Sequence, residues 1–429
     1  MTASDTLSVP TSVETQSGRS TSSAAAIAIV IAALTFNQVL AFVNASITPV
    51  TPLYVMAAEV LILAAAASLV WNRSESLYPL SVALAAWLVF AMTMRFQLDP
   101  KVLRDAFIPV LFYFLGRRCG TPEVCDRLVA LSIAVVGAFA VIEWAFLDTY
   151  IRWVDILGYY LAKGSTEVLP GGDGPGLFTS GIRFEGRTLL PFLGEHRVSS
   201  VFLEPVSLGN FGAIAFAWLL LRCRAYGWAF FGWSALVLVI LILGDARFGI
   251  YLCAGAAAIY LVAPLVRPGL VFVVPFVLVV GLIAYASALS GVAWDNTLTG
   301  RFLLSGQLLL TLDGWQSLGL APTDVNFVDS GYATVLSQFG LFGAAGLWAT
   351  YVFGTPAATP AARRFKLFVC FYLILLLSIS TSFSTIKTAA LLWFLAGAAA
   401  EDPPVEPGEQ CFTAGPPRGG SSPQHTALA

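Results

Sequence analysis

Hydrophobic residues occur along this chain in long runs, most of them close to the roughly 20 residues that a helix needs to cross a bilayer. Short polar segments separate most of these runs, and two polar segments are long. The predicted spans cover residues 23–43, 50–71, 78–94, 102–116, 126–147, 207–221, 227–244, 248–264, 269–290, 330–354, 365–381 and 384–400. The pattern predicts an all-α polytopic membrane protein with about 12 transmembrane helices.

The two ends of the chain differ from the apolar region between them. Residues 1–22 are more polar and less basic than the start of a secretion signal, and residues 401–429 are rich in proline, glycine and serine. We therefore predict a disordered cytoplasmic tail at each end and one membrane domain over residues 23–400.

Composition narrows the classes of partner. The chain of 429 residues is 58% hydrophobic and 11% charged, and its formal net charge is −2. A nucleic-acid-binding protein carries a basic surface, so we expect no nucleic-acid partner. The six cysteines form no CxxC pair and no HExxH motif is present, so we also expect no metal and no cofactor.

Basic residues in the short connections predict the orientation. With the amino terminus in the cytoplasm, 12 Lys and Arg residues lie inside and 5 lie in short outer segments. This asymmetry satisfies the positive-inside rule. It also places both long loops, about 148–206 and 291–329, on the same outer face.

Charged residues gather where the first long loop meets the next apolar run. Arg183, Arg197 and Glu204 lie in this segment, and Pro205 suits the first turn of a helix, with Ser199, Ser200 or Ser207 available as caps. An arginine at a helix amino terminus makes a site for phosphate. The alternative interpretation is an interfacial arginine that only pairs with Glu204.

Further charges interrupt apolar sequence elsewhere. Asp245 and Arg247 form either a structural ion pair or a site with a ligand-facing arginine. Arg301 lies in the second long loop. Asp329 precedes the tenth span, and it is either a general base or the cap of a helix beginning at Gly331. Lys387 begins the last span. The favoured interpretation is that it extends toward the membrane surface, and the alternative is a role near the site.

Three segments resemble the O-antigen polymerase and ligase superfamily of bacterial envelope proteins. RVSSVFLEP is similar to the family's segment after its large periplasmic loop, DARFG to the turn two helices later, and DSGYATVLSQFGLFG to the segment after the second loop. Arg183 and Gly194 fit an Arg-x10-Gly pattern found in some members, whereas Leu312 stands where Arg301 would need a glycine. Neither His196 nor His425 lies in the second loop, which favours a polymerase, most like the xanthan-type exopolysaccharide polymerases, over a ligase.

The resemblance implies block transfer of a glycan from undecaprenyl pyrophosphate onto a new lipid-linked repeat unit, at the periplasmic face of the bacterial inner membrane. It implies that Arg183, Arg197, Arg247 and Arg301 bind the departing pyrophosphate, and that Glu204 or Asp329 takes the proton from the attacking hydroxyl. The expected partners are lipid-linked glycans, membrane lipid, and a flippase and chain-length or export proteins of the same pathway.

Other classes of protein share parts of this pattern. A transporter or flippase of lipid-linked sugars also needs many helices and buried charges, but it places charges near the middle of its helices and uses broken helices. An O-antigen-type ligase is a second alternative, and a purely structural membrane protein does not explain Arg247.

Overall fold

A computed structural model describes residues 13–71, 76–164, 177, 179–183, 186–327 and 329–400, with side chains from residue 21 onward. Within these ranges the regular structure is helical, and extended pairing is limited to one isolated bridge between Ile182 and His196. The predicted helical fold class is confirmed to this extent.

The first long loop divides the helices into two groups. Before it and within it lie α1 (Val13–Ser46), α2 (Pro52–Val70), α3 (Leu77–Arg95), α4 (Pro100–Cys119), α5 (Pro122–Ala145), α6 (Leu147–Val154), α7 (Ile156–Ala162) and the 3-10 turns η1 (Thr179–Gly181), η2 (Pro191–Leu193) and η3 (Ser200–Phe202). After it come α8 (Pro205–Leu221), α9 (Cys223–Tyr226), α10 (Ala229–Leu243), α11 (Arg247–Val262), η4 (Ala263–Leu265), α12 (Pro268–Ala288), α13 (Leu298–Leu310), α14 (Gly314–Ser317), α15 (Gly331–Ala349), the π turn η5 (Thr350–Gly354), α16 (Pro360–Leu377), η6 (Ser382–Ser384) and α17 (Ile386–Ala399).

A helix lies at each of the twelve predicted spans, but these helices are not equally suited to crossing a membrane. By length and apolar composition, seven described segments could do so: Thr21–Ser46, Pro52–Val70, Leu77–Arg95, Pro122–Ala145, Arg247–Leu265, Pro268–Ala288 and Gly331–Gly354. α8, α10 and α17 are apolar but shorter. α4 and α16 carry several charged residues. The predicted count of twelve crossings therefore stays a prediction.

The predicted tails fall largely outside the described residues, which exclude 1–12 and 401–429. α1 begins at Val13, so its first turns lie within the segment predicted as a tail. The apolar part of this helix begins at Thr21, close to the predicted start of the first span at residue 23.

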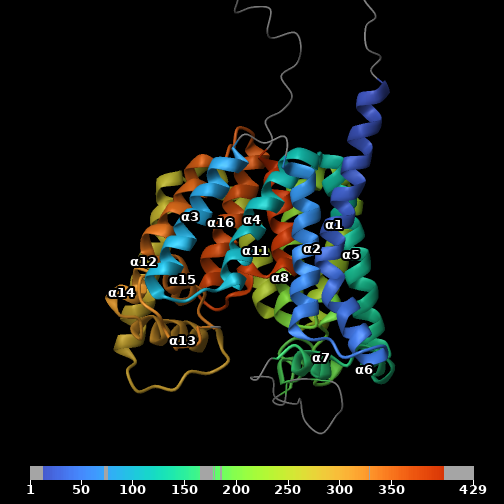
Figure 1. Cartoon of the computed structure of the whole chain (residues 1–429). Coiled ribbons are helices and arrows are strands. Elements are labelled where there is room, and N and C mark those ends of the chain that lie inside the picture. Colours follow the sequence, from blue (N-terminus) through green and yellow to red (C-terminus); the bar gives the residue numbers. More distant parts are fainter. Residues whose placement is uncertain are drawn as a thin grey trace, which may run out of the picture.

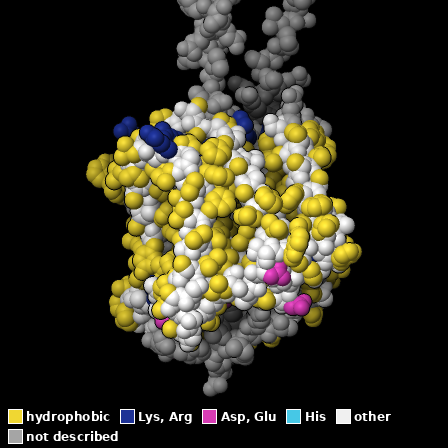
Figure 2. Space-filling view, turned by 90° about the vertical axis from the view of Figure 1, so that its left-hand side faces the viewer, with side chains coloured by type: hydrophobic (Ala, Val, Ile, Leu, Met, Phe, Trp, Pro, Cys, Tyr) yellow, Lys and Arg dark blue, Asp and Glu magenta, His cyan; other side chains and the backbone are white. Residues whose placement is uncertain are grey.

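The elements within the two long loops lie at one end of the bundle, which we call the loop end. α6, α7 and α13 cover this end in Figure 1, while α1 begins at the opposite end. On the face drawn in Figure 2, Lys and Arg side chains gather at the upper end and acidic side chains lie in the lower half. The elements of both long loops thus lie at the same end of the bundle, and their position on the outer side of a membrane stays a prediction.

Close backbone contacts at glycine pack the helices that carry the charged residues. A Cβ added at Gly249 of α11 would lie 2.7 Å from the carbonyl oxygen of Gly209 in α8. A Cβ at Gly397 of α17 would lie 1.9 Å from the carbonyl oxygen of Tyr113 in α4. Because a methyl group does not fit at either contact, glycine allows α8 to approach α11, and α17 to approach α4. The first contact places the start of α11, at Arg247, beside α8.

α15 is broken at Gly340, which has φ +68° and ψ 166°. The carbonyl oxygens released by the break are bound by side chains of α3: Trp87 donates its indole N–H to Phe339 at 2.8 Å, and Arg95 donates to Ser337 at 2.6 Å. Gly319, after α14, packs against the break. The second long loop is therefore attached to the interior of the bundle at this point.

Candidate functional site

A buried carboxylate holds the segment that enters α8. Glu143, in the last turn of α5, is fully buried and accepts the backbone N–H groups of Ser199, at 3.0 Å to Oε1, and of Ser200, at 2.6 Å to Oε2. Its Oε1 also lies 3.1 Å from Nε2 of His196. This carboxylate therefore fixes the residues on both sides of Arg197. Its signal in the sequence is a single glutamate inside an apolar run, which sequence reasoning missed.

Arg197 is buried against the backbone rather than open to a ligand. Its guanidinium donates to the carbonyl oxygens of Ser180 at 2.9 Å, Gly244 at 3.2 Å and Asp245 at 3.4 Å. Burial and the charges of nearby arginines lower its pKa, although a guanidinium remains protonated at neutral pH. The structure therefore gives Arg197 a role in joining the first long loop to the turn between α10 and α11.

Arg187 has a similar role, which the sequence did not indicate. Its guanidinium donates to the carbonyl oxygen of His196 at 2.9 Å and to that of Ile242. The side chain is buried among backbone carbonyls near the carboxyl end of α10, where a helix favours a cation.

Arg183 and Arg247 lie on either side of the Asp245 turn. Nε of Arg183 is 3.5 Å from Oδ2 of Asp245, whose other oxygen accepts the backbone N–H of Leu189 at 2.9 Å. Arg247 is partly exposed and forms neither a hydrogen bond nor an ion pair through its side chain with a described residue. The interpretation of Asp245 and Arg247 as a structural pair is therefore wrong, because Asp245 pairs with Arg183.

These cations influence one another electrostatically. Burial lowers the pKa of Arg183, the charges of Arg247 and Arg301 lower it further, and Asp245 acts in the opposite direction. Among the described residues, Asp245 is the carboxylate whose charge acts on the pKa values of Arg183, Arg187 and Arg197. A cluster with more cations than carboxylates is a favourable place for a multiply charged anion.

Arg301 lies in the second long loop, and its charge is among those that lower the pKa of Arg183. On α13, it donates to Oδ1 of Asp329 at 2.6 Å and to Oδ1 of Asn296 at 3.1 Å. The cap of α15 is Ser330, whose hydroxyl accepts the N–H of Ala333, so the interpretation of Asp329 as that cap is wrong. The prediction that the helix begins at Gly331 is confirmed. The Asp329 side chain is 43% exposed. Water can therefore solvate its carboxylate if a ligand binds Arg301 instead.

Glu204 is the residue before α8, but its side chain forms no capping hydrogen bond. The prediction that Ser199, Ser200 or Ser207 caps α8 is wrong. α8 begins at Pro205 as predicted, with Glu204 as the residue that precedes it. The carboxylate instead binds Lys387 at 2.7 Å, the hydroxyl of Tyr160 at 2.7 Å and that of Ser207 at 3.0 Å. Lys387 is 6% exposed, so the expectation that it extends to the surface is wrong.

The surroundings of Glu204 make it a weak base. Burial opposes its ionisation, but the Lys387 ammonium and the Tyr160 hydroxyl outweigh burial and lower the pKa of the carboxyl to about 2. Nearby, burial and the charge of Lys387 lower the pKa of Lys163 to about 8. The Lys163 ammonium lies 4.3 Å from the centre of the Tyr160 ring. This second charged group therefore involves α7, α8 and α17.

The six predicted site residues thus divide by their contacts. Arg183 pairs with Asp245, Arg247 lies two residues after Asp245 without a side-chain partner among the described residues, and Arg301 pairs with Asp329. Arg197 lies in the same cluster, but its donors bind the backbone. Glu204 belongs to the separate group with Lys387. The described residues contain no group of three or more His, Cys, Asp or Glu side chains that could hold a metal ion.

No family model, no curated protein and no solved structure matches this chain.

Proposed function

We propose that this chain is a polysaccharide polymerase, a glycosyltransferase that joins undecaprenyl-pyrophosphate-linked repeat units at the periplasmic face of the bacterial inner membrane during exopolysaccharide biosynthesis. The observation that carries the proposal is the Asp245 turn, where the buried Asp245 pairs with Arg183 and Arg247 follows two residues later without a side-chain partner among the described residues, while Arg301 on α13 lies at the same end of the bundle (Figure 1). A diphosphate brings the negative charge that this group lacks. Both chain termini would then be cytoplasmic.

In the proposed reaction the arginines stabilise the diphosphate leaving group. The hydroxyl oxygen of the incoming unit attacks the anomeric carbon of the growing glycan, and the bond from that carbon to the diphosphate oxygen breaks with its electron pair. Arg183, Arg247 and Arg301 stabilise the charge that develops on this oxygen, a task in which one lost contact costs about 3 kcal/mol of barrier. Arg197 positions the Asp245 turn through its bonds to the backbone.

We assign the general base to Asp329 rather than to Glu204. Glu204 has a pKa of about 2 and three partners, so it holds a proton poorly. Asp329 has Arg301 as its ion-pair partner. When a diphosphate takes Arg301, the carboxylate is released beside the reacting hydroxyl and can accept its proton. Binding of the leaving group would thereby prepare the base.

A transporter or flippase of lipid-linked oligosaccharides is the second candidate, favoured by one observation. α15 is broken at Gly340, and α4 and α12 contain Pro109 and Pro275 in their interiors. Interrupted helices are typical of transporters. A ligase remains less consistent with the chain, because neither histidine lies in the second long loop.

Reconstitution separates these functions. The purified full chain is placed in vesicles with a lipid-linked oligosaccharide supplied in the outer leaflet only, and both the sizes of the lipid-linked glycans and their distribution between the leaflets are measured. A polymerase produces a ladder of longer glycans, and Asp329→Asn slows its formation by about 10²-fold or more while Glu204→Gln slows it less. Movement of the substrate between leaflets without any increase in length would support the transporter and contradict the polymerase.

A further inference from the structure

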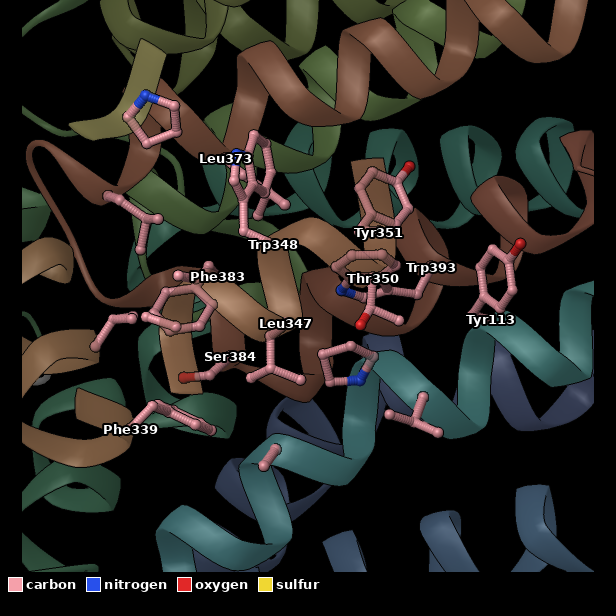
Figure 3. Close-up of a pocket in the computed structure, with 18 of the residues that line it drawn as sticks. Tyr113, Phe339, Leu347, Trp348, Thr350, Tyr351, Leu373, Phe383, Ser384 and Trp393 are labelled. Carbon is pink, nitrogen blue, oxygen red and sulfur yellow. The ribbon is translucent and has the colours of Figure 1, made fainter. Parts of the chain in front are cut away.

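An elongated apolar cavity of about 590 Å³ lies in the bundle, and no arginine of the loop end lines it. α3, α4, α12, α15, α16 and α17 contribute to its walls, and Figure 3 shows Trp348, Tyr351, Trp393 and Phe383 around the space between them. On α4 the lining runs from Val102 to Arg117, a rise of about 22 Å at 1.5 Å per residue. The cavity therefore extends along most of the thickness of a hydrocarbon core of about 30 Å.

The lining excludes a hydrophilic ligand along most of this length. Its charged residues are Asp105 near the start of α4 and Arg117 near the end of that helix. Between them the walls are mainly aliphatic and aromatic side chains, with a few hydroxyl and amide groups. A glycan placed there would lose its hydrogen bonds to water and gain few in return, whereas a hydrocarbon chain loses none.

One end of the cavity lies at the start of α15, close in the chain to Asp329. Tyr332 lines it, three residues after Asp329. Phe383 and Ser384 of η6 also line it, while Ser382 of the same turn faces the other way and accepts the amide N–H of Asn210 in α8 at 3.1 Å. One short turn thus separates the cavity from polar residues of the loop end.

We propose that this cavity holds the polyprenyl tail of the lipid-linked substrate while its diphosphate lies at the loop end. The inference rests on the proposed function for the identity of the lipid. A phospholipid acyl chain has similar chemistry, but the end of the cavity at Tyr332, three residues after Asp329, favours the lipid whose diphosphate the proposed function places near Asp329. A long tail held there would fix the depth of the diphosphate relative to the arginines.

Photocrosslinking tests the occupant directly. The photoreactive residue p-benzoylphenylalanine replaces Leu347, which lines the cavity, or, as a control, Val277 of α12, which is 64% exposed on the outside of the bundle. The full chain is placed in phosphatidylethanolamine and phosphatidylglycerol vesicles containing a small fraction of undecaprenyl phosphate, and the crosslinked lipids are identified by mass. We expect undecaprenyl phosphate to be enriched several-fold over its share of the vesicle at Leu347 but not at Val277.

A cavity-filling variant provides a second measurement. Ala345→Phe adds a ring inside the cavity and is expected to reduce the crosslink at Leu347 several-fold. Gly346→Phe is the matched control, because nothing lies within 4 Å of a Cβ added there. Crosslinking of phospholipid at Leu347 only in proportion to its abundance, or no lipid crosslink at all, would overturn the tail site.

The two proposals fail separately. Enrichment of undecaprenyl phosphate at Leu347 without any lengthening of glycans keeps the tail site and removes the polymerase. Glycan lengthening without that enrichment keeps the polymerase and removes the tail site.

Discussion

The ammonium of Lys387 lies 2.7 Å from the carboxylate of Glu204, although 183 residues separate them in the chain. The same ammonium donates to the carbonyl oxygen of Phe202 at 3.2 Å. The pair therefore joins the start of α17 to the segment that carries Arg197 into α8. It fixes the geometry of the loop end without belonging to the arginine group.

Replacing Lys387 by Met is expected to destabilise the protein by about 2 kcal/mol. The variant leaves the Glu204 carboxylate without its cation, and the cost is reduced because one third of the Glu204 side chain is exposed. Thermal unfolding of the purified chain measures the effect. Lys101→Met is the control, since 72% of the Lys101 side chain is exposed. Equal unfolding temperatures for the two variants would show that the pair contributes nothing.

The Glu204 pair also predicts a pH dependence of stability. The pKa of Glu204 is lowered from 4.5 to about 2. Because ionisation favours the folded state, this contribution is complete above pH 4.5 and is lost as pH falls toward 2. The unfolding temperature of the native chain should therefore exceed that of Glu204→Gln at neutral pH, with the difference shrinking through this range. A difference that stays constant down to pH 3 contradicts the assignment.

The break in α15 predicts different outcomes at two glycines of that helix. Gly340→Ala places a side chain at positive φ and a Cβ 2.0 Å from the carbonyl oxygen of Leu318, so we expect a loss of about 2 kcal/mol or more. Gly346→Ala meets nothing within 4 Å and should be neutral or slightly stabilising. Thermal unfolding distinguishes the two. Tolerance of alanine at Gly340 would show that α15 does not require this break.

Loss of the Arg197 side chain is expected to reduce the stability of the fold, whereas loss of the Arg247 side chain is expected to reduce activity alone. Arg197→Ala leaves three carbonyl oxygens without their shared donor, at a cost of about 3 kcal/mol, and should lower both yield and unfolding temperature. Arg197→Lys should recover part of the loss. Unchanged unfolding temperature in Arg197→Ala would show instead that this guanidinium is available to a ligand.

The helices could be predicted because apolar runs of sufficient length leave few alternatives to a helix. Pro205 and Gly331 marked the starts of α8 and α15 correctly. The break at Gly340 could not be predicted, because it depends on Trp87 and Arg95 of α3 and on the approach of Gly319. Glycine occurs at many other positions of this chain where the helix continues.

The candidate site could be predicted only in part, because charged residues stand out in an apolar sequence whereas their partners do not. Charge in an apolar sequence identified Arg183 and Arg301, which the structure pairs with Asp245 and with Asp329. Partners could not be predicted, because they come from distant segments: Arg197 binds carbonyls 17, 47 and 48 residues away. The same limit explains why Lys387 was expected at the surface, since its neighbours in sequence do not reveal Glu204.

The most direct test of the arginine group is the length of glycan made by Arg247→Ala in the reconstituted vesicles. Arg247 forms no side-chain hydrogen bond or ion pair with a described residue, so the variant should fold normally and keep the native unfolding temperature. We predict that it binds lipid-linked units poorly and lengthens them at least about 10²-fold more slowly than the native chain. Native rates of lengthening by a correctly folded Arg247→Ala chain would contradict the central claim that these arginines bind the departing diphosphate.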